Sequence, residues 1–262
     1  MMNLKRIALQ IAYDGSQFYG WQKQYISPTV QEVLEQALEK IFKVQTNLTG
    51  SGRTDSGVHA LCQIAHFEHN VNMNTEQLKL ALVTKIPHSI KILNAWEVDV
   101  AFHARYSATK RHYTYLISKE FTPFQRLYQA NLYKYKINAE RIAEAIPYFI
   151  GENDFTSFCK PNPEVNNHVC CIDSLSIEET TDCFVIKISA NRFLHNMVRR
   201  IVGALVMVSH RNHSPEIISK WINDKKHEQK NFFTAPASGL YLAEVEYNKE
   251  LFPYDIKKIK IY

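Results

Sequence analysis

The sequence lacks the features of a membrane or secreted protein. Its longest apolar run, residues 201–208, is far shorter than the ~20 residues that a bilayer span requires. The start of the chain has no apolar core of signal-peptide length followed by a small-residue cleavage site. No C-x-x-C pair occurs, and adjacent Cys170 and Cys171 suit neither zinc nor an easy disulfide. These absences predict a cytoplasmic protein in a reducing compartment with no membrane partner.

A strong charge imbalance is also missing. Hydrophobic residues make up 45% of the chain and charged residues 22%, which is typical of a globular protein and excludes disorder as the main state. Lys and Arg together number 31 against 26 for Asp and Glu, a formal net charge of +5. This mild basic excess permits a polyanionic partner such as nucleic acid without requiring one.

No low-complexity linker interrupts the chain, and strand and helix signals alternate along it. In the first half, strands are predicted near residues 7–13, where alternation indicates a half-buried strand, and near 62–68 and 90–98. A capping box at Thr29–Glu32 opens one helix, and a shorter helix follows Thr75. In the second half, strands are predicted at 111–118, 183–191 and 239–247, with helices after Asn138, near 194–205 and at Ser214.

This order predicts an α+β fold. We expect two similar α/β-sandwich halves with mainly antiparallel sheets that meet at a central cleft. Residues 1–107 are predicted to form the N-terminal half, and residues 108–262 the C-terminal half.

Glycine is scarce except at one place. Three of the 8 glycines, Gly50, Gly52 and Gly57, fall in the stretch LTGSGRTDSGVHA. A phosphate-binding loop is excluded on two grounds. No Lys-Ser/Thr pair follows the second glycine, as the P-loop requires, and Asp55 stands where the dinucleotide fingerprint has its third glycine. Two explanations remain: a tight turn without chemistry, and a loop that presents Asp55, kept ionised by Arg53, as a nucleophile or base.

The histidines give no convincing metal site. His66 and Glu68 match the H-x-E half of a zinc deaminase, but the P-C-x-x-C half is absent. His59, His66 and His69 lie close in sequence without a sulfur or carboxylate ligand at suitable spacing. We therefore expect surface or core-edge histidines on a strand, and no metal.

The whole string GRTDSGVHA resembles the signature G-R-T-D-x-G-V-H-A of the TruA family of tRNA pseudouridine synthases. Other blocks are similar to that family in the same order: YDGSQFYGWQ, FHARYSATKRHYTYLI, GENDFTSFC, ANRFLHNMVRRIVG and TAPASGLYL. The resemblance implies an isomerase that needs no cofactor and converts uridine to pseudouridine at positions 38–40 of the tRNA anticodon stem-loop. It also implies a homodimer that binds tRNA across both subunits.

The resemblance implies roles for particular residues. Asp55 matches the nucleophile, and Arg53 the residue that anchors it and touches the displaced nucleotide. Tyr113 matches the tyrosine that stacks on the target base, and Arg199 the basic residue that pairs with the aspartate from the other half. Further substrate contacts are implied for Leu240, as an apolar wall of the base pocket, and for the basic residues Lys110, Arg111 and Arg105.

Each of these positions also has a structural explanation. From the residues alone, Tyr113 could be a strand tyrosine packed beside Tyr115, and Leu240 could simply open an inner strand. Cys159 stands where the family often has a basic residue, which would weaken one RNA contact. Two other functions stay open at this point: a non-catalytic tRNA-binding module, and a zinc base deaminase built on His66 and Glu68.

Overall fold

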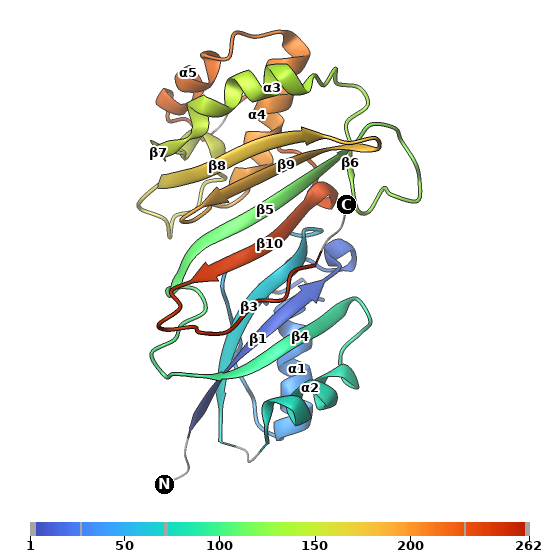
Figure 1. Ribbon diagram of the computed structural model, residues 1–262, viewed down its shortest axis with the longest axis vertical. Helices are drawn as coiled ribbons and strands as arrows, with labels where there is room; N and C mark the ends of the chain where they lie inside the picture. Colours follow the sequence, from blue (N-terminus) through green and yellow to red (C-terminus); the bar gives the residue numbers. More distant parts are fainter. Residues whose placement is uncertain (1–3, 27, 71–72, 228, 260–262) are drawn as a thin grey trace. The chain divides into compact units, whose positions relative to one another are not determined.

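The structure, a computed structural model, describes residues 4–26, 28–70, 73–227 and 229–259, which divide into two compact units (Figure 1). Unit 1 contains the chain up to Thr109 and again from Leu242 onward, whereas unit 2 is Lys110–Tyr241. Each unit combines helices with mainly antiparallel strands, so the α+β prediction is confirmed. The structure departs from the predicted division at the C-terminal segment, which belongs to unit 1 and not to the second half.

The strands of unit 1 follow the order β4, β1, β3, β10. Their bounds are β1 (Lys5–Tyr13), β3 (His59–His69), β4 (Ile90–Val98) and β10 (Leu240–Tyr247), of which the first two residues of β10 belong to unit 2. β1 pairs antiparallel with both β3 and β4, and the short β2 (Thr49–Gly50) pairs with β3. β10 returns from the end of the chain to lie beside β3, which no local sequence pattern could indicate.

β1 is buried more completely than predicted. Residues 7–11 are all at most 1% exposed, so the strand is covered on both faces and the half-buried prediction is wrong. Its polar Gln10 is bonded to the C-terminal segment: Nε2 donates to the carbonyl of Lys257 at 2.6 Å, and Oε1 accepts from the Lys257 N–H at 3.1 Å. Because these bonds satisfy Gln10, a polar residue can occupy a buried position that alternation assigns to solvent.

Two helices complete unit 1. In α1 (Val30–Phe42), the Thr29 hydroxyl accepts from the N–H of Glu32 at 3.3 Å, as expected of an N-cap. A reciprocal capping box is formed at α2 (Thr75–Val83), between Asn74 and Gln77. α2 packs against β4, and α1 contacts α2 (Figure 1).

In unit 2 the strand order is β5, β9, β8, β7, with antiparallel pairing throughout. The bounds are β5 (Ala108–Ser118), of which Ala108 and Thr109 belong to unit 1, β7 (Gly151–Asp154), β8 (Val169–Glu179) and β9 (Cys183–Ala190). The two-residue β6 (Ala130–Asn131) runs parallel to β5. The sequence analysis predicted neither β7 nor β8, because the apolar alternation of β8 is interrupted at the exposed Asp173 and Ser174, where its pairing with β9 shifts register.

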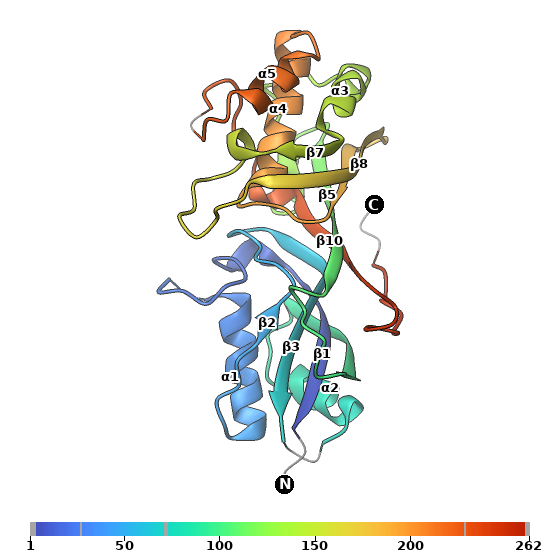
Figure 2. The ribbon, with the colours of Figure 1, turned by 90° about the vertical axis from the view of Figure 1, so that its left-hand side faces the viewer.

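Within its described residues, unit 2 contains the helices α3 (Ala139–Ala145), α4 (Met197–Arg211) and α5 (Ile217–Asn223) (Figure 2). α3 packs against α4 and β8. It ends where Pro147 opens a 3₁₀ turn, as predicted. The 3₁₀ turns among the described residues are η1 (Gly15–Gln17), η2 (Ile146–Phe149), η3 (Thr156–Phe158) and η4 (Ala237–Gly239). Among the helices that the structure describes, none has both the length and the hydropathy to cross a bilayer.

Candidate active site

The Asp55 loop, defined here as residues 51–58, joins β2 to β3 in unit 1 and is held by the backbone of the segment after β1. The N–H of Trp21 donates to the carbonyl of Thr54 at 3.1 Å, and the N–H of Gly57 donates to the carbonyl of Phe18 at 3.2 Å. The N–H of Val58 donates to the carbonyl of Asp55 at 3.1 Å and closes a turn. Gly57, third in that turn, has φ 77°, a conformation that favours glycine.

Glycines on both segments allow this close approach. A Cβ on Gly15 would lie 1.9 Å from the carbonyl oxygen of Val58, and one on Gly20 would lie 2.6 Å from that of Thr54. Gly52 differs, because no atom lies within 4 Å of the position that its Cβ would take. The two glycines of YDGSQFYGWQ thus allow the segment after β1 to pack closely against the backbone of the Asp55 loop. Gly52, two positions before Thr54, borders open space instead.

Side chains fix the loop while leaving Asp55 accessible. The Tyr13 hydroxyl and Thr54 Oγ1 share a hydrogen bond of 2.8 Å in the interior. His59 is buried, and its Nδ1 accepts from the N–H of Gly15 at 3.1 Å. Asp55 is half-buried and Arg53 exposed. The loop is therefore fixed by its backbone bonds and by Thr54, while Asp55 keeps part of its surface accessible and Arg53 is exposed.

Tyr113 lies on β5 in unit 2 and is 9% exposed, with its ring perpendicular to that of Phe193 at a centroid distance of 5.1 Å. Tyr115, two residues on, is fully buried, and its hydroxyl donates to the carbonyl of Pro236 at 2.8 Å. Burial raises the pKa of Tyr115 well above its ordinary value. Tyr115 is thus an internal packing residue, whereas Tyr113 keeps a small accessible surface.

Arg199 and Arg200, neighbours on α4, have different surroundings. Arg199 is half-buried, and its Nε donates to the carbonyl of Ala235 at 2.7 Å while its Nη1 donates to Oδ1 of Asn196 at 3.0 Å. Arg200 donates from Nη2 to the carbonyls of Ser157 and His227, both at 2.9 Å. Arg200 therefore joins two loops of unit 2 and is not a solvated surface residue.

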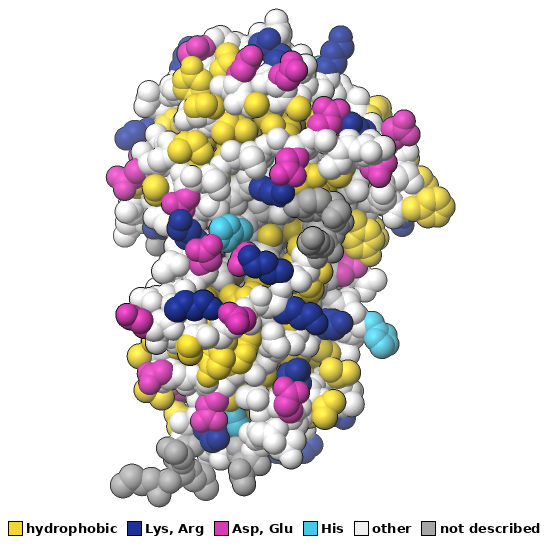
Figure 3. All heavy atoms as spheres, viewed as in Figure 1, with side chains coloured by type: hydrophobic (Ala, Val, Ile, Leu, Met, Phe, Trp, Pro, Cys, Tyr) yellow, Lys and Arg dark blue, Asp and Glu magenta, His cyan; other side chains and the backbone are white. Residues whose placement is uncertain are grey.

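The remaining predicted contact residues are spread over both units. Leu240, at the start of β10, is 5% exposed. Lys110 forms an ion pair with Asp173 at 3.3 Å, and Arg111 Nη1 donates to the carbonyl of Asn191 at 2.9 Å. In unit 1 the exposed Arg105 lies over the ring of Tyr106, 5.6 Å from its centroid. The face of each unit in Figure 3 carries acidic and basic side chains interspersed.

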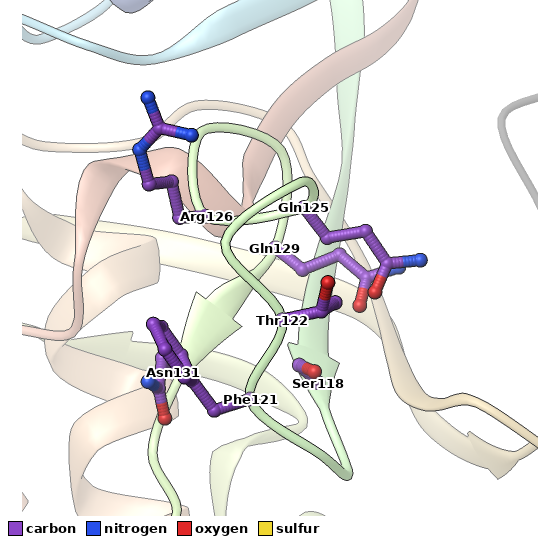
Figure 4. A pocket seen from close by; sticks show the side chains of 7 residues that line it. All are labelled: Ser118, Phe121, Thr122, Gln125, Arg126, Gln129 and Asn131. Carbon is purple, nitrogen blue, oxygen red and sulfur yellow. The ribbon is translucent and has the colours of Figure 1, made fainter.

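The structure thus divides the predicted site residues between the units. Arg53, Asp55 and Arg105 belong to unit 1, and Lys110, Arg111, Tyr113, Arg199 and Leu240 belong to unit 2. Other residues line a shallow depression beside β6, namely Ser118, Phe121, Thr122, Gln125, Arg126, Gln129 and Asn131 (Figure 4). A second depression, on α1, is likewise lined by residues outside the predicted site.

Comparison with known proteins decides the family. The profile of a family described as tRNA pseudouridine synthase matches residues 9–107 and 145–248. The chain belongs to the tRNA pseudouridine synthase family. It is 39% identical over 246 residues to "tRNA pseudouridine synthase A 2" of Clostridium perfringens, an alignment that covers 93% of this chain and 100% of the relative. It is 41% identical over 245 residues to "tRNA pseudouridine synthase A" of Ehrlichia chaffeensis, covering 92% and 100%.

The family is a family of isomerases, so the resemblance seen in the sequence is confirmed and the chain is placed among the enzymes that modify tRNA. Solved structures match more distantly. A structure of an "H/ACA RNP bound to a substrate RNA containing 2'-deoxyuridine" is 8% identical with a TM-score of 0.37, covering 89% of this chain and 59% of that one. A "Cbf5-Nop10-Gar1 Complex" is 10% identical with a TM-score of 0.35, covering 76% and 44%.

The histidines of β3 are packing residues in this tRNA pseudouridine synthase family member. His66 Nδ1 accepts from the N–H of Ala104 at 3.2 Å, and burial lowers its pKa to about 4. His69 stacks on Phe42 at 4.8 Å. Glu68 forms an ion pair with Arg6. These partners explain the histidines and Glu68 without the zinc deaminase, which nothing in the family assignment favours.

One cluster of ligand-type side chains escaped the sequence reading. Within the described ranges, Cys159, His168 and His227 form the group of three or more Cys, His, Asp or Glu residues whose ligand atoms could reach one metal ion. All three belong to unit 2. No familiar spacing rule indicates them, because Cys159 and His168 are the two ends of the segment between η3 and β8, and His227 lies on a distant loop after α5.

Proposed function

We propose that this protein isomerises uridine to pseudouridine at positions 38–40 of the tRNA anticodon stem-loop, with Asp55 as the nucleophile. In this reaction the bond from uracil N1 to ribose C1′ breaks, the base turns, and a bond from C5 to C1′ forms. C5 loses a proton and N1 gains one, so the products have the same atoms as the substrate. The net reaction consumes no oxidant, reductant or hydrolytic water, and the carboxylate acts on the base or on the sugar.

The observation that carries the proposal is the setting of Asp55. Its loop is fixed by three backbone hydrogen bonds, two of them to the segment after β1, and its carboxylate is half-buried two residues from the exposed Arg53 guanidinium. The loop also bears the family's signature string. A nucleophile on a rigid support loses little entropy when it reaches the reacting geometry. Arg53 anchors the carboxylate and contacts the backbone of the displaced nucleotide.

We assign the other roles from the groups that each residue offers. Tyr113 stacks on the extruded base with its remaining exposed surface, because an aromatic face tolerates rotation of the base in its own plane. Arg199, oriented by two hydrogen bonds, takes the role of the basic residue that the family resemblance assigns to this position. Leu240 supplies an apolar wall, and the basic residues Lys110, Arg111 and Arg105 contact phosphates.

The protein works as a homodimer in the cytoplasm under this proposal. Large apolar side chains are exposed on the segment between β5 and α3, where burial against a second copy would be favourable. They are Phe121, Phe124, Leu127, Tyr128 and Tyr133.

Mapping pseudouridine in tRNA treated with the pure protein tests the proposed reaction and its position together. Unmodified tRNA transcripts with uridines at positions 38–40 are expected to gain pseudouridine there, while transcripts with cytidine at those positions are expected to stay unmodified. Pseudouridine formed elsewhere in the tRNA would refute the positional assignment. Tight tRNA binding with no pseudouridine at all would support the non-catalytic RNA-binding module instead.

The role of Tyr113 predicts a graded response to substitution. Tyr113→Phe keeps the stacking face but removes the hydroxyl, so kcat is expected to fall about 10²-fold if that hydroxyl assists proton removal, with KM little changed. Tyr113→Ala removes both groups and is expected to raise KM as well. The measurement is steady-state release of the C5 hydrogen from labelled tRNA.

Tyr148→Phe, which removes from a half-buried tyrosine of the same unit a hydroxyl that donates to Oε1 of Glu216 at 3.1 Å, is the matched control and is expected to leave both constants unchanged. Full activity of Tyr113→Phe would limit Tyr113 to stacking. Full activity of Tyr113→Ala would exclude it from the site.

A further inference from the structure

A sulfur and two imidazoles converge on one side of η3 in unit 2. Cys159 Sγ lies 3.7 Å from Nδ1 of His227, and the rings of His227 and His168 are 5.2 Å apart at 68°. The ligand atoms of all three residues lie within 4.8 Å of one another. Tetrahedral zinc, with Zn–S near 2.3 Å and Zn–N near 2.0 Å, separates sulfur from nitrogen by about 3.6 Å, so the Cys159–His227 pair already has the required spacing.

Backbone bonds bring the two ends of the segment between η3 and β8, and the loop that carries His227, to the same place. The carbonyl of His168 accepts from the N–H of Phe155 at 3.0 Å, just before η3. Arg200 donates to the carbonyls of Ser157 and His227, and so ties the His227 loop to η3. Cys159 follows η3 directly, as its C-cap. The three ligands are thus held independently of their own side-chain contacts, as a preorganised site requires.

A second bond reinforces this frame. The N–H of Lys226 donates to the Ser157 hydroxyl at 3.1 Å, one residue before His227. The Arg200 guanidinium also lies over the ring of Phe232, 5.5 Å from its centroid, and Phe232 stacks on Phe158 at 4.8 Å. Cys159 is 1% exposed, whereas His168 and His227 are half-buried, so the cluster has a closed side and a side that solvent can reach.

We propose that Cys159, His168 and His227 bind one zinc ion, with solvent as the fourth ligand. One thiolate and two neutral imidazoles form a donor set that suits zinc, and three protein ligands with one solvent ligand complete a tetrahedron. On binding, the Cys159 S–H bond gives its proton to solvent and an S–Zn bond forms, with no change of oxidation state. The ion cross-links the polar segment between η3 and β8 to the loop after α5.

This zinc ion would stabilise unit 2, which contains all three ligands. None of the three is among the residues assigned to the proposed isomerisation. The Cys159–His227 contact could exist as a plain S–H···N hydrogen bond, and the His168–His227 contact as ring packing. Metal binding itself is therefore the decisive measurement, and its outcome does not depend on whether the protein forms pseudouridine.

The experiment titrates the reduced, metal-free full-length chain with Zn²⁺ against a chromophoric chelator, and with Co²⁺ as a spectroscopic probe. One equivalent of Zn²⁺ per chain is expected, and Co²⁺ is expected to give the visible bands of a tetrahedral site with a sulfur-to-cobalt charge-transfer band. Cys159→Ser, His168→Gln and His227→Gln are each expected to weaken Zn²⁺ binding by at least about 100-fold. Zn²⁺ is also expected to raise the midpoint of thermal unfolding of the parent by a few degrees.

Cys171→Ser and His88→Gln are the matched controls, since they remove a half-buried cysteine and an exposed histidine that lie outside the cluster. Both are expected to bind Zn²⁺ like the parent. His168→Gln changes a half-buried loop residue and is expected to fold, so it keeps the test valid if Cys159→Ser does not. Any one of three results would overturn the proposal. The parent could fail to bind one Zn²⁺, Cys159→Ser could keep the charge-transfer band, or His168→Gln could bind Zn²⁺ as tightly as the parent.

Discussion

Asp55→Asn is expected to lower the release of the C5 hydrogen from labelled tRNA uridines by about 10⁴-fold or more, the scale of loss when an enzyme's nucleophile is removed. The amide keeps the size and shape of the carboxylate but has neither its charge nor its nucleophilicity. Because Asp55 is half-buried on a loop held by backbone bonds, the loop is expected to keep its structure. tRNA affinity, measured by filter binding or fluorescence anisotropy, is expected to change little.

Asp182→Asn is the matched control, because Asp182 is an exposed aspartate of unit 2 whose backbone carbonyl accepts from the N–H of Lys119. Its substitution is expected to leave hydrogen release unchanged. Substantial hydrogen release by Asp55→Asn would remove Asp55 from the role of nucleophile. Loss of both release and tRNA binding, with unchanged thermal stability, would instead assign Asp55 to substrate binding.

Gly15→Ala is expected to destabilise unit 1 by about 3 kcal/mol, as overpacking against a rigid neighbour does. The added methyl group would lie 1.9 Å from the carbonyl oxygen of Val58, an approach that the backbone can relieve only by moving η1 away from the Asp55 loop. The free energy of unfolding is measured by urea denaturation. Catalysis at temperatures where the variant remains folded is expected to fall as well, because the same movement displaces Asp55.

Gly52→Ala separates the clash from the general effect of replacing a glycine. Nothing lies within 4 Å of the position of its Cβ, so its free energy of unfolding is expected to stay within about 1 kcal/mol of the parent. Equal stability of Gly15→Ala and the parent would mean that η1 does not seat the Asp55 loop. Equal destabilisation by both substitutions would mean that the loop is sensitive to glycine replacement at any position.

Local patterns predicted the elements whose own residues carry the signal. β4 (Ile90–Val98) forms where its apolar residues predicted a strand, although its burial does not alternate strictly, and the helix cap at Asn138 is formed as expected, with its Oδ1 accepting from the N–H of Arg141 at 2.9 Å. β8 was missed because its apolar alternation is interrupted between Ile172 and Leu175, where its pairing with β9 shifts register. A strand of this kind is stabilised by its pairing with β7 and β9, which the sequence of β8 does not contain.

The functional residues likewise divide into those that the sequence indicated and those that only the structure brought together. The string GRTDSGVHA singled out Arg53 and Asp55, because glycine and charge gathered within a few residues are visible in any reading of the chain. Cys159, His168 and His227 gave no such signal, since their ligand atoms meet only after two segments far apart in the sequence are folded together. Arg200, to which the sequence analysis assigned no role, joins these two segments.

The sequence by itself determined the family, the α+β class and the identity of the candidate nucleophile, because these depend on residues that are neighbours in the chain. Only the tertiary structure decided that most of β10 and the C-terminal segment belong to unit 1, where Lys257 bonds Gln10. It also decided which of two adjacent arginines joins the loops, and that a cysteine and two histidines meet. The physical reason is that hydrogen bonds and metal coordination act over a few ångströms in space, whatever the separation of their partners along the chain.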